Sequence, residues 1–291
     1  MVSVKTEKIA PFIFLIPPLL TVGVIIYGII TTIFFSFTNA KLVGGTIDFV
    51  GLQNYASLFS DPLFYTSLKN NLIFLFFIGI VPLFLGLFIA ILLSMKVRGA
   101  ILFKSLFFFP LILSFVVTGN IWSWLYLSEA GLINTGLRTF GLGFLAMPWL
   151  SSTTLAVPAM GITGIWQLIG LPIILFSAGL IDIPKNMIDA SRLDATTFQT
   201  YRYVVIPLLK PVFVGVATIS IISAWKIFDL ILIMTYGGPL TSSYVLAFFV
   251  FIKTLSSYQV GYGSAAATIL FLVSLITIVV LVLLAKGRKQ E

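Results

Sequence analysis

The sequence contains no cysteine and no histidine, and only 9 of its 291 residues are acidic. Without cysteine the chain can form no disulfide, thiol nucleophile or thiolate metal site, and without histidine it has no imidazole for catalysis or haem ligation. It also lacks a phosphate-binding loop of the form G-x-x-x-x-G-K-[ST], an H-E-x-x-H motif and any cluster of carboxylates. These absences predict no catalytic residue, no metal site and no cofactor bound by the chain, and they argue against an enzyme.

Charged residues are scarce, whereas apolar residues are abundant. Only 9% of the residues are charged and 59% are hydrophobic, with a mean hydropathy of +1.15. Soluble domains carry about 25% charged residues. The net charge of +8 would suit a nucleic-acid partner, but the basic residues stand at the ends of apolar runs, which is typical of membrane topology. The sequence therefore predicts an all-α, multi-pass membrane protein whose surroundings are the lipid bilayer, with no nucleic acid bound.

The charge-free runs predict how often the chain crosses the membrane. A membrane helix needs about 20 mostly apolar residues to cross about 30 Å of hydrocarbon. We expect one transmembrane domain over residues 1–291 with six spans, at 10–36, 70–95, 105–127, 154–180, 211–234 and 265–285. The apolar stretch 244–252 is too short to cross alone, so it favours an interfacial or re-entrant piece; the alternative is a tilted seventh span.

The distribution of lysine and arginine predicts the orientation of these spans. With six spans, twelve basic residues fall on one side and four, namely Lys41, Lys69, Arg138 and Lys253, on the other. Cytoplasmic loops carry the excess of Lys and Arg. Both termini are therefore expected in the cytoplasm, in a protein of the cell membrane.

The predicted cytoplasmic loop 182–210 has more pattern than a connector needs. Small and apolar residues alternate there with charged ones, and Asp189 and Arg192 are three residues apart, so they can pair on one helix face. The simpler interpretation is a solvated connector, which is polar because it leaves the membrane. The length of the loop, its small residues and its ending in Pro207-Leu-Leu-Lys-Pro211 favour a structured element instead.

This loop resembles the EAA loop of binding-protein-dependent ABC importer permeases, which reads roughly E-A-A-x-x-D-G-A and ends in a Leu-Pro pair. Asp189 stands at the glutamate position, Ala190 and Ser191 at the two alanines, Asp194 at the aspartate, and Ile206-Pro207 at the Leu-Pro pair. The family glycine is absent, and Ala195 follows a one-residue gap. The stretches FVGLQNY, GIWQLIGLP and TYGGP resemble the sugar branch of the family (maltose or glycerol-phosphate permeases), so the resemblance covers nearly the whole chain.

The resemblance implies a type I ABC importer permease fold and a role as half of a membrane passage for a sugar or related polar solute. It implies a second, different permease subunit, two cytoplasmic ATPase subunits that bind ATP and Mg²⁺, and an external solute-binding protein. It also implies that the loop forms a short helix that docks on an ATPase subunit and carries the coupling residues Asp189, Ala190, Ser191, Arg192, Asp194 and Ala195.

Polar residues inside the spans are candidates for a substrate pathway. Lys226 and Asp229 are three apart and would share one helix face, either as a structural ion pair or as a polar lining of the passage. Trp225 beside them would stack on a sugar or simply sit at the membrane interface. The amides of Asn120 and Gln167, like those of Asn70 and Asn71, suit sugar hydroxyls but equally suit helix–helix hydrogen bonds.

The alternative function is an ion-coupled secondary transporter that works without ATPase subunits. Such carriers usually bury several ionisable groups along their path. Asp229 is the only acidic residue inside a predicted span, and only Lys226 stands near it in the sequence. This shortage favours a transporter whose driving energy comes from a partner.

Overall fold

The computed structural model describes residues 4–95 and 99–286, and in that part of the chain the regular secondary structure is helical apart from one bridge between Thr38 and Phe49. The all-α prediction is confirmed. The described residues divide into two compact units, the first made of residues 4–61 and 250–269 and the second of residues 62–249 and 270–286.

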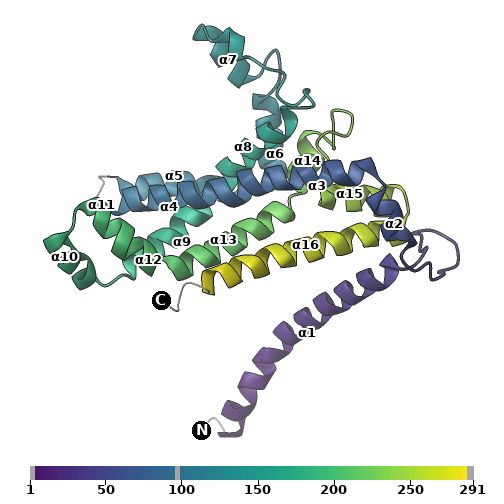
Figure 1. Ribbon diagram of the computed structural model, residues 1–291, viewed down its shortest axis with the longest axis horizontal. Helices are drawn as coiled ribbons and strands as arrows, with labels where there is room; N and C mark the ends of the chain where they lie inside the picture. The colour runs from purple at the N-terminus through teal and green to yellow at the C-terminus, as the bar shows by residue number, and fades with distance from the viewer. Residues whose placement is uncertain (1–3, 96–98, 287–291) are drawn as a thin grey trace. The chain divides into compact units, whose positions relative to one another are not determined.

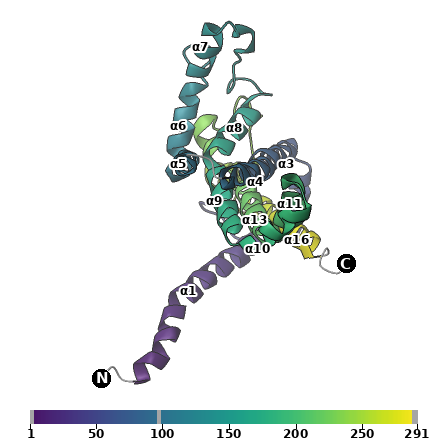
Figure 2. The same cartoon turned by 90° about the vertical axis from the view of Figure 1, so that its left-hand side faces the viewer.

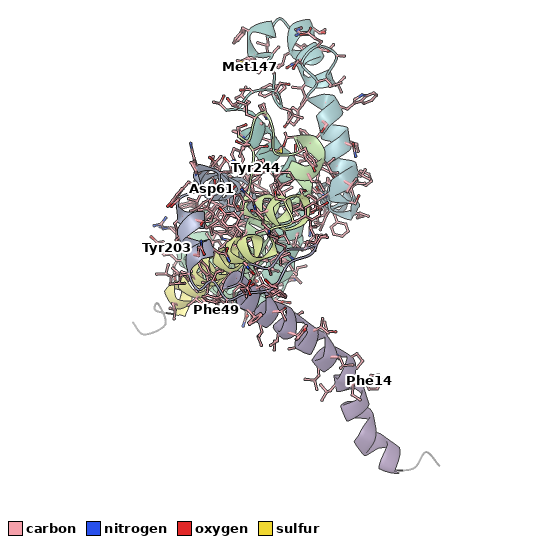
Figure 3. The ribbon with its side chains drawn as sticks, turned by 90° about the vertical axis from the view of Figure 1, so that its right-hand side faces the viewer. Phe14, Phe49, Asp61, Met147, Tyr203 and Tyr244 are labelled. Carbon is pink, nitrogen blue, oxygen red and sulfur yellow. The ribbon has the colours of Figure 1, made fainter. Side chains whose placement is uncertain are left out.

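Unit 1 contains the first helix and the segments that meet its C-terminal end. Its elements are α1 (Val4–Ser36), α2 (Gln53–Phe59), η4 (Ile252–Ser256) and the start of α16 (Val260–Lys286). Phe14 projects away from α1 (Figure 3), whose part from Phe14 to Ser36 is strongly apolar and almost wholly exposed in the single chain. The end of α1 is held by Asn54, whose amide donates to the carbonyl oxygens of Ser36 and Thr38 at 2.9 and 2.8 Å.

Unit 2 begins with one long continuous span and one sharply bent helix pair. Its first elements are α3 (Pro62–Phe74), η1 (Leu75–Ile80), α4 (Val81–Ser94), α5 (Ala100–Ile112), α6 (Phe115–Leu125), α7 (Leu132–Thr139) and η2 (Gly143–Leu145). The predicted span 105–127 falls on α5 and α6, whose axes are bent by 102° instead of continuing in line. The bend has a local cause, because Ser114 leaves the helix and caps α6 by accepting a hydrogen bond from the Val117 amide at 3.3 Å.

The second half of unit 2 supplies the central bundle and one polar end. Its elements are α8 (Ala156–Leu168), α9 (Gly170–Ile181), α10 (Lys185–Asp194), α11 (Thr197–Thr200), η3 (Tyr201–Val205), α12 (Ile206–Leu208), α13 (Lys210–Trp225), α14 (Asp229–Met234) and α15 (Leu246–Phe251). Helices α4, α9 and α13 enclose an apolar core of Leu83, Ala90, Phe176, Val216 and Ala217. Helices α10, α11 and α12 lie at one end of this unit with the end of α4, whereas α14 lies at the opposite end (Figure 1).

The described helices include five that are long and apolar enough to cross a membrane, or six if the bent pair α5–α6 is one span. The five run over Phe14–Ser36, Pro62–Ser94, Ala156–Ile181, Lys210–Met234 and Val260–Ala285. The segment predicted at 244–252 forms an apolar helix over Leu246–Ser256, which is too short to belong to this group. Within unit 2, α6 and α7 project from the rest of the bundle (Figure 2).

Candidate functional site

Helix α10 carries most of the residues expected to couple the chain to an ATPase. Ile188 on one face packs against a buried cluster of Ile183, Val205 and Leu209, which anchors the helix. Asp189, Ala190 and Asp194 are exposed. The predicted pairing of Asp189 with Arg192 involves a side chain that lies outside the described ones. The helix therefore has one anchored face and one open face that includes a small residue.

The end of α10 differs from the prediction at Ala195. This residue has extended backbone angles (φ −131°, ψ 147°), so it follows the helix instead of belonging to it. Thr196 then starts α11 through a reciprocal capping box with Gln199, in which each side chain accepts a hydrogen bond from the other residue's backbone N–H. The Ser191 hydroxyl lies 3.2 Å from the Thr200 hydroxyl and ties the two helices together. The expected coupling segment, residues 185–200, is thus a pair of short helices.

The coupling segment is also tied to the membrane bundle. Tyr201, which begins η3, packs against the same buried cluster as Ile188, and its hydroxyl lies 3.1 Å from the Ser94 hydroxyl at the end of α4. Tyr203 in η3 is exposed (Figure 3). A force on α10 therefore reaches α4 through a hydrogen bond and a shared apolar cluster.

The expectation that Lys226 and Asp229 share a continuous helix face is wrong. Helix α13 ends at Trp225, Lys226 is its C-cap, and α14 begins only at Asp229. Lys226 is exposed and Asp229 is half-buried. The ion pairs within the described residues are Arg138–Glu129 and Lys253–Asp61, so Lys226 and Asp229 do not pair with each other. Both flank a break in the fifth apolar span.

The remaining pathway candidates lie in different surroundings. Trp225 is 2% exposed and its indole Nε1–H has no hydrogen-bond partner, so its ring presents no face to a solute here. Gln167, also 2% exposed, donates through Nε2 to the Leu113 carbonyl at the α5–α6 bend, at 3.0 Å. Asn120 is exposed and bonds only its own helix, through the Val116 carbonyl at 2.8 Å.

Asn120 lies on α6, which packs against α14. A Cβ built on the neighbouring Gly119 would lie 3.0 Å from Cγ2 of Ile233 in α14. The structure thus packs α6 against the C-terminal part of α14, while Gln167 belongs to the bend. The described residues bring no three acidic side chains together that would hold a metal ion.

Sequence reasoning missed one polar cluster in unit 1. Lys253 lies 3.4 Å from the Asp61 carboxylate, which also accepts a hydrogen bond from the Tyr262 hydroxyl at 3.0 Å. The Lys253 ammonium lies 5.3 Å from the centre of the Tyr262 ring. Asp61 and Tyr262 are 201 positions apart, so no local pattern could have revealed the contact.

Comparison with known proteins identifies the family. Residues 82–290 match the family described as binding-protein-dependent transport system inner membrane component. A probable ABC transporter permease protein of Pyrococcus horikoshii is 38% identical over 268 residues, covering 91% of this chain and 92% of that one. The arabinooligosaccharides transport system permease protein AraP of Bacillus subtilis is 32% identical over 291 residues, covering 98% and 91%.

A solved structure shares the fold at low sequence identity. One chain of a bacterial alginate ABC transporter, crystallised with an alginate pentasaccharide-bound periplasmic protein, superposes with a TM-score of 0.84 at 15% identity, covering 98% of this chain and 97% of that one. The likeness confirms the predicted permease fold. The match over residues 82–290 and the 38% identical relative establish that this chain belongs to the binding-protein-dependent transport system inner membrane components, the multi-pass permease subunits of ABC importers.

Proposed function

We propose that this permease forms half of a membrane passage for a sugar or related polar solute, beside a second, different permease subunit. The names of its relatives support the substrate class. AraP is a permease for arabinooligosaccharides, and the multiple sugar-binding transport system permease protein MsmF of Streptococcus mutans is 33% identical over 275 residues, covering 94% of each chain. An external binding protein delivers the solute to the outer ends of the two permeases.

Two cytoplasmic ATPase subunits, which bind the ATP and Mg²⁺, supply the energy through α10. The observation that carries this proposal is the arrangement of that helix: Ile188 anchors one face in a buried cluster, while Ala190 is exposed on the other. A small residue lets a partner surface approach closely. When the ATPase subunits close, α10 moves, and its ties to α4 pass the movement to the spans. Each conformational state then needs its own set of contacts.

The proposed docking of α10 also gives the orientation of the chain in the membrane. Helices α10, α11 and α12 and the C-terminal end of α16 lie together at one end of unit 2 (Figure 1). Docking of α10 on a cytoplasmic ATPase places that end in the cytoplasm, which agrees with the excess of twelve basic residues over four on the predicted inner side. The C-terminus is then cytoplasmic, and an even number of spans puts the N-terminus on the same side.

A single substitution tests the docking. Ala190→Glu adds bulk and a charge to the open face of α10, and a few central residues usually dominate such an interface. We expect ATPase subunits to co-purify poorly, because each loss of about 1.4 kcal/mol weakens binding about tenfold. Ala56→Glu, on the exposed face of α2, makes the same chemical change elsewhere and should leave co-purification unchanged. Equal ATPase recovery with both variants would refute the docking assignment.

A further inference from the structure

Two adjacent asparagines of α3 bond backbone groups that lie more than 150 positions away in the sequence. Asn71 is fully buried, and its Nδ2 lies 3.4 Å from the Ala224 carbonyl oxygen and 3.5 Å from that of Trp225. Its Oδ1 accepts a hydrogen bond from the Leu246 amide at 2.7 Å. One side chain therefore joins α3, the end of α13 and the start of α15.

Asn70 makes the corresponding contacts with the loop that follows α14. It is 5% exposed, and its Nδ2 donates to the carbonyl oxygens of Ser242 and Tyr244 at 2.7 and 2.8 Å. The loop has its own bonds as well, because the Ser243 hydroxyl donates to the Gly238 carbonyl at 2.6 Å and lies 2.8 Å from the Thr235 hydroxyl. Figure 3 labels Tyr244 in this loop. The loop is thus internally braced and fastened to α3 at a single side chain.

These contacts matter because they lie where α13 stops. The last carbonyl groups of a helix have no partner within it, and hydrocarbon supplies no water to satisfy them. Asn71 meets two of these carbonyl groups, on Ala224 and Trp225, directly before Lys226 and the break that precedes Asp229. The amide thereby permits a helix end in an otherwise apolar span.

We infer that Asn70 and Asn71 are positioning residues of the transport pathway. Asn71 fixes the helix break that carries Lys226 and Asp229, and Asn70 fixes loop 235–245 relative to α3. The inference deepens the proposed function, on which its link to transport rests. The two asparagines have separate targets, so a change in one should displace only its own target.

Spin-label distances in the full-length chain test this separation. In lipid nanodiscs, with the permease purified together with its partner subunits, a reference label is placed at Leu92→Cys, an exposed site of α4. Residue 92 lies roughly 33 Å from residue 70 along the span, at about 1.5 Å per residue. The second label is placed at Leu240→Cys, which is 90% exposed in the loop, or at Lys226→Cys at the break. The natural chain has no cysteine, so within the permease the label attaches only at the introduced sites, and partner subunits free of reactive cysteine are used.

Asn70→Ala should broaden the distances to the loop label and leave those to the break label unchanged, and Asn71→Ala should do the reverse. We expect the ratio of native to displaced population to fall about tenfold in each case, equivalent to ~1.4 kcal/mol. If Asn71→Ala does not fold, Asn71→Ser takes its place. The serine side chain is too short to bridge the elements, so the distances to the break label should broaden in the same way.

Thr66→Ala is the matched control on the same helix, because the Thr66 hydroxyl bonds only the Pro62 carbonyl of α3. It should change neither distance. Unchanged distances in the asparagine variants, or equal broadening of both labels, would overturn the inference. Both distances lie within the permease chain and neither involves α10, so failure of the Ala190→Glu test would leave this result standing.

Discussion

The contact between α8 and η1 allows a sharp test of packing in the bundle. A Cβ added to Gly161 in α8 would lie 2.5 Å from Cγ, 2.8 Å from Cδ2 and 2.9 Å from Cβ of Phe77. Non-bonded carbon atoms prefer about 3.5–4.0 Å, so each of these atoms would have to retreat by about 1 Å. Because the Phe77 Cβ is itself involved, rotating the ring cannot relieve the overlap, and the backbone of η1 has to move.

The free-energy cost of this overlap in Gly161→Ala can be separated from the intrinsic helix preference of alanine. Overpacking of this kind costs about 1–3 kcal/mol, while alanine in place of glycine in a helix gains about 1 kcal/mol. Gly215 in α13 offers the matched control, because an added Cβ would meet no atom within 4 Å. Both glycines lie inside helices, so the helix preference cancels and the packing cost remains as the difference between the variants.

We expect Gly161→Ala to melt below Gly215→Ala. A difference of about 2 kcal/mol corresponds to roughly 4–8 °C in Tm for a domain of this size. The measurement is thermal unfolding of the purified permease in one detergent, followed by intrinsic tryptophan fluorescence. The reasoning fails if Gly161→Ala melts at the same temperature as Gly215→Ala or above it.

Three further predictions follow from the membrane orientation, the helix break and an outer loop. A single cysteine replacing Glu291, which lies outside the described residues, should resist impermeant reagents added to intact cells; external labelling would contradict the orientation. Replacing Lys226 by Leu together with Asp229 by Met should reduce solute uptake and preserve assembly, whereas undiminished uptake would exclude both from the pathway. Hydrogen bonds from Thr46 and Asn39 lower the pKa of Asp48 below its ordinary value, so these two contacts in loop 39–48 should persist at and above that ordinary value and be lost as pH falls through the lowered pKa. Hydrogen exchange measures this, and an identical pH profile in Asp48→Asn would refute it.

The features that hydropathy governs could be predicted from the sequence. Charge-free runs locate apolar spans because hydrocarbon excludes charge, and the helix at Lys185–Asp194 follows from alternating small, apolar and charged residues. The sequence also contains a signal for the end of that helix, because Thr196 and Gln199 have the spacing of a capping box, which starts a new helix. The resemblance to the EAA loop extends through Ala195, and it alone predicts that Ala195 belongs to the helix.

The breaks within the spans could not be predicted in the same way. No charge interrupts the chain at Leu113 and Ser114, so hydropathy does not register the 102° bend that follows α5. The assumption that Lys226 and Asp229 share a face requires α13 to continue, but its last carbonyl groups meet the amide of Asn71, about 150 positions earlier. Such a stop depends on a tertiary contact, which a local pattern does not contain.

The same contacts divide the amide candidates for the substrate pathway. A buried polar group in apolar surroundings is costly unless it is hydrogen-bonded, and an amide that already bonds the protein has fewer groups left for a solute. Three amides already bond the protein, because each donates to the backbone of another segment: Asn70, Asn71 and, through Nε2, Gln167. Asn120 bonds only its own helix and is exposed in the single chain. In this conformation Asn120 and Lys226 are exposed and Asp229 is half-buried, so we propose that a solute-binding role falls to these three before the other amides.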